Sequence, residues 1–469
     1  MKKIEIIPHG WLVVRYMYPY LSLLIIPLVK ELLKKSRLSV FLSLEVLALL
    51  IAFTVAVIKR VKFRCIMTED GIFVKSGLFI KKEYFVPTEK AAVVSVERNA
   101  LLRIFNTATL KIYGSFGRKS ERIVDIPITL RYAELVEKMY SIKPENEIYE
   151  CGFLGTLLSS AADSSLSVGL FIALPIINLS GKIIGTSIKD ILLRELKETD
   201  YVIPNLIEKG VRILSLILII GYAVSFLNAF LKNVNFKIFK DGDFLLIKAG
   251  ILPRRSICFK SGDITAAAVR KSPVLRIIKK VSVMVSVGGY GTETRENCLL
   301  LPLVSEKTAK LFFEIYAPEV ALSTPRIQHP KSSVLRFLRP PILIAVSSIV
   351  GFLVFGQKFP SAKTTLLYLT AFAVSVCVIL TVLRYGFFVT GGMTVTEKNI
   401  SVSSYGIFSE RQLHFKTENA EMAQIKTTPF DRRLGLSRIK FFVFGKNRNR
   451  ITLKNMGEDE LLKTYCLWE

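Results

Sequence analysis

The sequence predicts a membrane protein that combines α and β structure. Three transmembrane helical hairpins alternate with three small β-barrel or sandwich domains, each closed by a C-terminal helix. Three observations predict this class. Hydrophobic residues make up 51% of the 469 residues, the longest apolar segments fall in three pairs, and one pattern of landmarks recurs after each pair. A pattern repeated at constant spacing indicates one structural unit copied along the chain.

The repeated landmarks are a Gly that follows a small or aromatic residue and an Arg that lies 26 positions further on, within an apolar run. We expect the Gly to permit a turn with positive φ between two strands. We expect the Arg to mark the start of a later strand, with its apolar neighbours in the core. The three copies are Gly77 with Arg103, Gly250 with Arg276, and Gly406 with Arg432.

The apolar segments are candidate membrane spans, because a bilayer core requires about 20 mainly apolar residues in a helix. The third segment is the weakest, since it contains Pro175 and Asn178. Six spans place all three β domains on one face of the membrane. If the third segment only lies on the surface, the first domain faces away from the other two. The six segments are Trp11–Val29, Leu38–Ile58, Leu166–Ile184, Val211–Leu231, Pro340–Phe355 and Thr364–Phe388.

The first apolar segment contains Arg15 and lacks a small-residue cleavage site, so we interpret it as a retained span. A slight excess of Lys and Arg around the β domains favours a cytoplasmic location for them. The basic tip 30–37 of the first hairpin argues against that orientation. Between Thr186 and Gly210 the pattern fits a helix that lies on the membrane or packs on a domain.

Each repeat reads as short strands separated by Gly turns, followed by a helical pattern, which is typical of a sandwich or partly open barrel. We therefore expect about seven strands and a closing helix per domain. The predicted hairpins are residues 1–60, 150–231 and 335–390, and the predicted β domains are residues 61–145, 232–320 and 391–469.

The pattern around the Gly and Arg landmarks resembles the bacterial pleckstrin-homology-like (PH-like) domain of the bPH2 type, formerly DUF304. Paired spans that alternate with three such domains are similar to the YdbT-type multi-pass membrane proteins of Gram-positive bacteria. The likeness covers nearly the whole chain. The copies differ locally: Asp431 stands where the others have Leu102 and Leu275, and Lys279-Lys280 stands where the third has Gly435-Leu436. The resemblance implies a scaffold or binding role without an established catalytic activity.

The formal charge of +27, from 65 Lys and Arg against 38 Asp and Glu, implies an acidic partner. Anionic lipid headgroups are the first candidate, since basic residues near a membrane surface attract them. Nucleic acid is not expected as a partner, because the aromatic residues fall on the apolar phase of the strands and not among the basic residues. The candidate contacts with lipid or a protein partner are Lys81, Lys82, Arg254, Arg255, Lys279, Lys280, Arg432 and Arg433.

The sequence contains no constellation that indicates catalysis, a metal or a cofactor. His9, His329 and His414 lie in different regions without carboxylates or Cys at ligand spacing, and no phosphate-binding loop is present. The six Cys are not paired at CxxC spacing, so we expect buried thiols. The chain is therefore predicted not to be an enzyme.

Glu45 and Arg15 are ionisable residues inside predicted spans, where such residues are often functional. Glu45 lies in the second span and Arg15 in the first. Either could serve a proton or substrate path, or the two could pair, with Arg15 reaching the interface instead.

The favoured hypothesis is a multi-pass scaffold in the cell membrane that associates with itself or with a second membrane protein and contributes to envelope integrity or to antimicrobial-peptide tolerance. A transporter or export component with Glu45 on its path is the first alternative. A sensor of anionic lipid is the second. Function is expected where the copies differ, at Asp431, at Lys279-Lys280 and in the charged turns.

Overall fold

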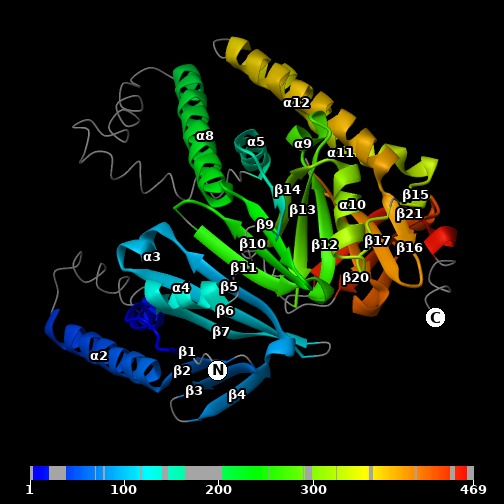
Figure 1. The fold of residues 1–469 in the computed structure, drawn as a ribbon. Coiled ribbons are helices and arrows are strands. Elements are labelled where there is room, and N and C mark those ends of the chain that lie inside the picture. Colours follow the sequence, from blue (N-terminus) through cyan, green and yellow to red (C-terminus); the bar gives the residue numbers. More distant parts are fainter. Residues whose placement is uncertain are drawn as a thin grey trace.

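The computed structural model shows three β domains in a row, with long helices that leave them (Figure 1). The structure describes residues 4–20, 38–68, 70–77, 80–116, 119–139, 146–163, 203–252, 254–288, 290, 298–323, 325–358, 363–406, 409–443 and 449–461.

Domain 1 is a sandwich of two antiparallel halves. Its first half has the strand order β1-β2-β3-β4, and its second half contains β5, β6 and β7, followed by helix α4. The elements are β1 (Ile4–Ile6), β2 (Arg64–Met67), β3 (Gly71–Ser76), β4 (Lys82–Pro87), β5 (Ala91–Arg98), β6 (Thr107–Phe116), β7 (Lys119–Thr129) and α4 (Leu130–Met139).

Domain 2 repeats this plan with four strands, then three strands and a helix. Its elements are β8 (Glu147–Glu150), β9 (Lys237–Asp241), β10 (Phe244–Ala249), β11 (Arg254–Lys260), β12 (Ile264–Lys271), β13 (Val281–Val287), β14 (Cys298–Val304) and α10 (Glu306–Tyr316).

Domain 3 repeats the plan again, and a helix begins at Glu458. Its strands are β15 (Ile327–Gln328), β16 (Gly392–Val395), β17 (Asn399–Tyr405), β18 (Glu410–Lys416), β19 (Ala420–Lys426), β20 (Leu436–Val443) and β21 (Asn449–Gly457).

The first strand of each domain comes from the chain before a hairpin, and the second strand comes from the chain after it. β1 pairs with β2, β8 with β9, and β15 with β16. Both ends of each hairpin are thereby held in one sheet.

The domains are joined edge to edge, because neighbouring domains share a sheet. β5 of domain 1 pairs with β11 of domain 2, and β12 of domain 2 pairs with β18 of domain 3. The result is two seven-stranded sheets that each contain strands of two domains. Among the described residues no sheet closes on itself, so the expected barrels are open sandwiches.

The cores follow the same sharing. One apolar cluster fills domain 1, whereas a second contains Val93 and Tyr113 of domain 1 together with most of the core of domain 2. Tyr113 packs edge-on against Tyr290 at 5.2 Å between ring centroids. The core of domain 3 likewise includes Ala266 and Ala268 of domain 2. The row is therefore continuous in packing as well as in hydrogen bonding.

Two helices, Lys331–Lys358 and Leu366–Thr390, are long and apolar enough to cross a membrane, and a shorter apolar helix spans Ile217–Asn233. The first two coincide with α11 and α12, the helices of the third predicted pair. The shorter helix is the C-terminal part of α8, in the second predicted pair. The third predicted span lies outside the described residues, as do the second half of the first span and the hairpin tips. The helices are α2 (Leu38–Lys62), α8 (Ile203–Asn233), α11 (Val334–Lys358) and α12 (Lys363–Thr390).

In Figure 1, α2, α8 and α12 each run from the periphery into the strands that follow them, α2 from the left and α8 and α12 from the top. Domains that share a sheet also lie on one side of any membrane that these helices cross. The third apolar segment lies outside the described residues, so the side of the membrane on which each domain lies stays a prediction.

Candidate functional site: the helix-side ends of the domains

The repeated landmarks lie together at one end of each domain, which we call the helix-side end: the end where a long apolar helix joins the sheet. In domain 1, α2 ends at Lys62, and Arg64 pairs with Lys75 two residues before Gly77. In domain 2 the amide of Gly250 donates to the carbonyl of Val234, directly after α8, at 2.7 Å. The turn at each Gly therefore packs against the base of its helix.

The expected role of the Gly holds in two copies. Gly77 has φ 121° and Gly250 has φ 91°, a backbone region that favours glycine. A Cβ at Gly77 would lie 1.9 Å from the carbonyl oxygen of Ile80. Gly406 is not among the positive-φ glycines, and a Cβ there would meet Ser409 at ordinary contact distance. The third Gly therefore marks the turn without being required by it.

The expectation for the Arg was wrong. Each Arg lies in a helix of one turn between two strands: α3 (Ala100–Ile104), α9 (Pro273–Ile277) and α13 (Pro429–Arg432). Several apolar neighbours point outward and are not in the core. Ile104 is 75% exposed, Ile277 81% and Phe430 75%. Each short helix thus presents an apolar tip beside an Arg at the helix-side end.

The predicted basic contacts occupy these ends. Lys82 begins β4 directly after Lys81, and both are exposed. Arg254 and Arg255 begin β11. Lys279 and Lys280 follow α9, while Arg432 and Arg433 end α13. They do not gather at one point but repeat along the row. Exposed apolar residues accompany them, including Ile80 and Ile251.

Arg255 is turned toward the join between domains and not toward solvent. It stands opposite Glu97 in the shared sheet, and its Nη2 donates to Asn233 Oδ1 at 3.3 Å. Among the predicted contacts, Arg255 therefore has an evident structural role.

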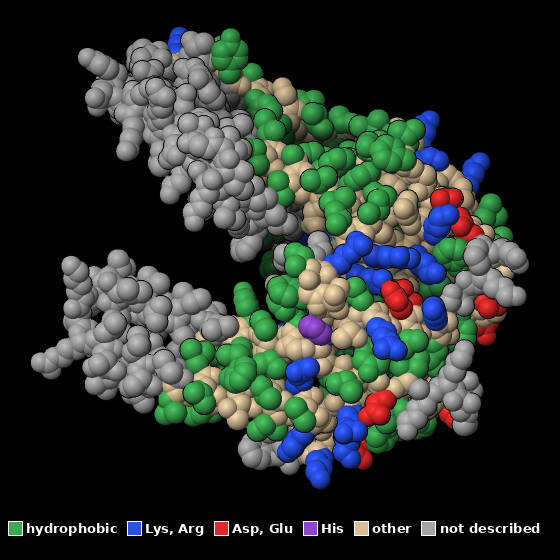
Figure 2. Space-filling view, turned by 60° about the vertical axis from the view of Figure 1, so that its left-hand side comes forward, with side chains coloured by type: hydrophobic (Ala, Val, Ile, Leu, Met, Phe, Trp, Pro, Cys, Tyr) green, Lys and Arg blue, Asp and Glu red, His purple; other side chains and the backbone are tan. Residues whose placement is uncertain are grey.

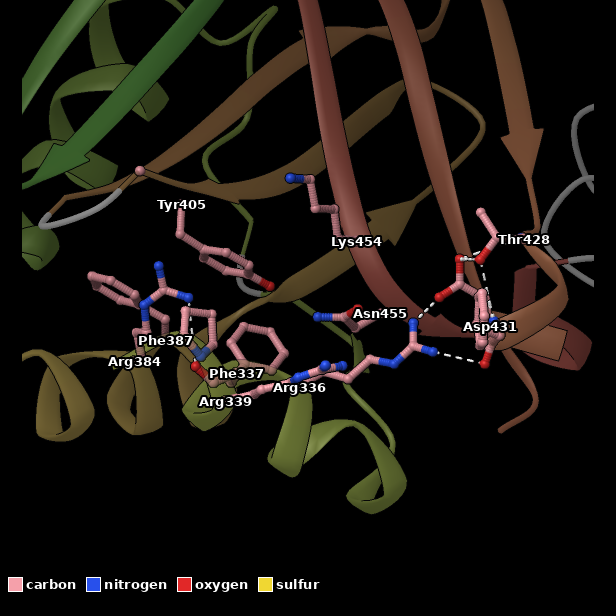
Figure 3. Close-up of a pocket in the computed structure, with 13 residues that line it drawn as sticks. Arg336, Phe337, Arg339, Arg384, Phe387, Tyr405, Thr428, Asp431, Lys454 and Asn455 are labelled. Carbon is pink, nitrogen blue, oxygen red and sulfur yellow. Dashed lines mark hydrogen bonds and ion pairs between the residues drawn. The ribbon is translucent and has the colours of Figure 1, made fainter. Parts of the chain in front are cut away.

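A pocket of about 490 Å³ opens at the helix-side end of domain 3. Arg339 and Arg384 come from α11 and α12, and Tyr405 and Lys454 come from the strands that face them (Figure 3). The helix-side turn at Gly406 and the short helix α13 complete the wall. Figure 2 shows Lys and Arg side chains gathered beside the apolar surface of the helices.

Asp431 is buried at the rim of this pocket and neutralises part of its charge. It accepts from Thr428 Oγ1 at 2.6 Å in a capping box, pairs with Arg336, and lies 3.3 Å from Arg438. Asp431, which stands where the other two copies have Leu, thus links α13 to the start of α11. Within the part of the chain that the structure describes, no carboxylate pairs with Arg339, Arg384 or Lys454.

A neutral aromatic layer lies behind the pocket. Tyr405 stacks on Phe387 at 5.7 Å, and its hydroxyl hydrogen-bonds His329 Nε2. Burial lowers the pKa of His329 to about 4, so its ring is uncharged at neutral pH. The positive charge of the pocket therefore comes from Arg and Lys alone, and the arrangement suits a small anionic group beside an apolar surface.

Of the two ionisable residues singled out inside predicted spans, Arg15 has a partner in domain 1. Arg15 forms two hydrogen bonds to the carboxylate of Asp125 in β7, at 2.7 and 2.8 Å. It therefore pairs with a residue of domain 1. Glu45 lies in α2. An apolar groove of about 530 Å³ runs between the N-terminal helix and α2, with Arg15 and Lys59 on its lining.

The described residues hold no group of three or more His, Cys, Asp or Glu that could bind a metal. Five cysteines are free and buried: Cys65, Cys151, Cys258, Cys298 and Cys377.

Sequence reasoning missed the pocket because its cations come from three distant segments. A usable signal was present: Arg336, Arg339 and Arg384 lie near the domain-side ends of otherwise apolar helices. Cations at that depth are costly unless they face a partner or an interface.

A row of PH-like sandwich domains with apolar helices at one end defines a class of membrane proteins with tandem PH-like domains. The bacterial PH domain family model bPH_2 matches residues 21–142, 188–320 and 343–465, so the chain belongs to this family. It is also 20% identical, over 344 residues, to the UPF0699 transmembrane protein YdbT of Bacillus subtilis strain 168, covering 66% of this chain and 68% of that protein. No solved structure matches the chain.

Proposed function

We propose that this membrane protein is a non-enzymatic multi-pass scaffold whose row of PH-like domains binds anionic lipid headgroups at the helix-side ends. The observation that carries the proposal is the pocket at α11, α12 and domain 3, where Arg339, Arg384 and Lys454 face one cavity at the base of apolar helices. A phosphate-bearing headgroup supplies the charge that this cavity lacks, and its acyl chains extend along the helices.

The repeated tips support the same proposal. An apolar side chain such as Ile277, with the exposed cation Lys279 two residues further along the chain, matches the boundary between acyl chains and headgroups. Three ends in a row place several such contacts on one surface. Each cation near that surface contributes about 1 kcal/mol of attraction to anionic lipid.

The test measures headgroup binding by full-length protein in neutral detergent, titrated with short-chain phosphatidylglycerol and with phosphatidylcholine. Arg339→Gln with Lys454→Gln should weaken phosphatidylglycerol binding about 10- to 30-fold, since two cations contribute about 2 kcal/mol. The matched control replaces Lys90 and Lys398, exposed lysines at the opposite ends of their domains, and should bind as the parent does. Equal binding of both lipids, or no effect of the pocket variant, would overturn the proposal.

We propose that the scaffold contributes to envelope integrity or to antimicrobial-peptide tolerance, with the domains on the cytoplasmic side. A cell that lacks the protein should be more sensitive to a cationic peptide, and the pocket variant should fail to restore growth. Restoration by the pocket variant would separate any such role from lipid binding.

A transport role for Glu45 remains the alternative from another class. If Glu45→Gln abolishes a measurable flux while the protein stays folded in the membrane, the transport role is favoured over the scaffold role.

A further inference from the structure

The two joins between domains are copies of one another. In the first, Arg98 stands opposite Arg254. In the second, Lys271 stands opposite Glu410. These pairs occupy equivalent positions when the domains are aligned on Gly77, Gly250 and Gly406. The same edge of each domain thus meets the same edge of the next, in the same register.

One copy of each edge is left without a partner strand at the ends of the row. β4 ends the first sheet, and β19 ends the last sheet. β4 is the equivalent of β11 and β18, and β19 is the equivalent of β5 and β12. The described part of the chain therefore has an unused edge of each type.

These open edges expose side chains that the internal joins bury. Phe85 is 57% exposed and Tyr84 46%, whereas their equivalents Cys258 and Ile257 are 7% and 0% exposed. Met422 is 48% exposed, and its equivalent Ala266 is 1% exposed. An apolar edge strand that is left open is a template for pairing with another chain.

We propose that β4 of one copy pairs antiparallel with β19 of a second copy and continues the row from chain to chain. The internal register fixes the contact: Val86 faces Met422, Phe85 faces Ala423, and Tyr84 faces Gln424. Pro87 lacks an amide hydrogen, and it falls just beyond the last equivalent pair, Phe259 with Val93. The ladder therefore needs no hydrogen from it.

The proposed register places two cations opposite each other, and one internal join contains the same arrangement. Lys82 faces Lys426 in it, but the equivalent internal pair is Arg270 with Arg411, which the structure accommodates. There Arg270 also pairs with Asp163 at 2.7 Å.

The contact joins two different surfaces, so it propagates until the subunits close a ring or form an open arc. Every domain keeps its helix-side end on the same side of the row, so the assembly extends in the plane of the membrane. This inference names the partner of the proposed scaffold and rests on that proposal. It does not depend on lipid binding at the pocket, and the two tests can fail separately.

The experiment traps the contact by disulfide formation in membranes that contain full-length protein. One chain carries Phe85→Cys, a differently tagged chain carries Ala423→Cys, and the two are co-expressed. Oxidation should link the two tags, because directly opposed residues of antiparallel strands lie within disulfide reach. Each single variant alone, and Phe85→Cys with Gln424→Cys one register away, should link at most weakly.

A variant with Met422→Glu added to the Ala423→Cys chain should lose the link, because it places a charge against Val86. Met422 is 48% exposed, and the half-buried Ala423 is replaced by a side chain of similar size, so folding should be retained. Absence of the link, in membranes where the internal pair of strands β5 and β11 can be cross-linked, would overturn the proposal. Linkage to a different protein without linkage between the tags would also overturn it.

Discussion

Equivalent positions in the three domains are held in one backbone conformation by different residues. A residue two or three positions after each short helix has a left-handed backbone in all three copies: Asn106 has φ 52°, Lys279 has φ 53° and Gly435 has φ 61°. Left-handed residues commonly end helices, and glycine adopts this conformation without a steric penalty. Lys279 therefore differs from Gly435 first in the free-energy cost of its left-handed backbone conformation.

Lys279→Gly should stabilise the protein by about 0.5–1 kcal/mol, because it removes the cost of a left-handed side-chain-bearing residue. Thermal unfolding in detergent measures the change. Lys279→Ala is the matched control, since it removes the same charge and keeps a Cβ, and it should not stabilise. Equal gains from both variants would attribute the effect to charge.

The second residue-scale difference is Asp431, which replaces a Leu found in the other copies. Asp431→Leu should destabilise domain 3 by about 2–3 kcal/mol, because it leaves the partly buried Arg336 without its carboxylate. Adding Arg336→Leu should restore part of the loss, and the double-mutant cycle measures the coupling. Additive losses would show that the pair contributes no coupling.

At the scale of the element, strands were predictable and their short connections were not. The alternating and continuous apolar runs correctly predicted strands such as β10 and β13. The helices α3, α9 and α13 have only four or five residues, too few for helical periodicity to be distinguished from the start of a strand. β15 contains two residues, and its pairing depends on a partner more than sixty residues away.

His414 on strand β18 should make the stability of domain 3 depend on pH. His414 is buried on this strand and hydrogen-bonds Ser401 at 2.7 Å. Burial, with Lys271 and Lys310 nearby, lowers its pKa from 6.5 to about 3. Below pH 6.5 the unfolded chain gains a proton that the folded chain does not, so stability is lost as pH falls from 6.5 toward 3.

The loss from His414 should approach about 1.4 kcal/mol per pH unit within that window. His414→Gln should flatten the dependence of the melting temperature on pH between 7 and 5, since Gln can bond Ser401 without titrating. An unchanged pH dependence would assign the acid response to other groups, among which His329 is the next to replace.

At the scale of the whole molecule, the repeat count and the family followed from the sequence, but the sharing of sheets did not. A repeat predicts equivalent domains and says nothing about which edges meet. The edges are chosen by apolar strands such as β5 and β12, which are buried on both faces. Full burial is also what a strand in the centre of one domain would show, so the pattern alone does not identify a join between domains. The pocket at domain 3 was hidden for a different reason, because its walls come from α11, α12, α13 and strands of domain 3 that lie far apart in the sequence.

The shared sheet can be tested inside one chain, because Val94 of domain 1 stands opposite the native Cys258 of domain 2. Val94→Cys should form a disulfide with Cys258, since opposed residues of antiparallel strands have Cα atoms within bridging distance. Burial raises the pKa of Cys258 to about 12, so the link should form slowly and faster at alkaline pH. Peptide mapping by mass spectrometry identifies it, and adding Cys258→Ser is the matched control. Domains that moved independently on flexible linkers would give no preference for Cys258, and the continuous row, with every consequence drawn from it, would then be wrong.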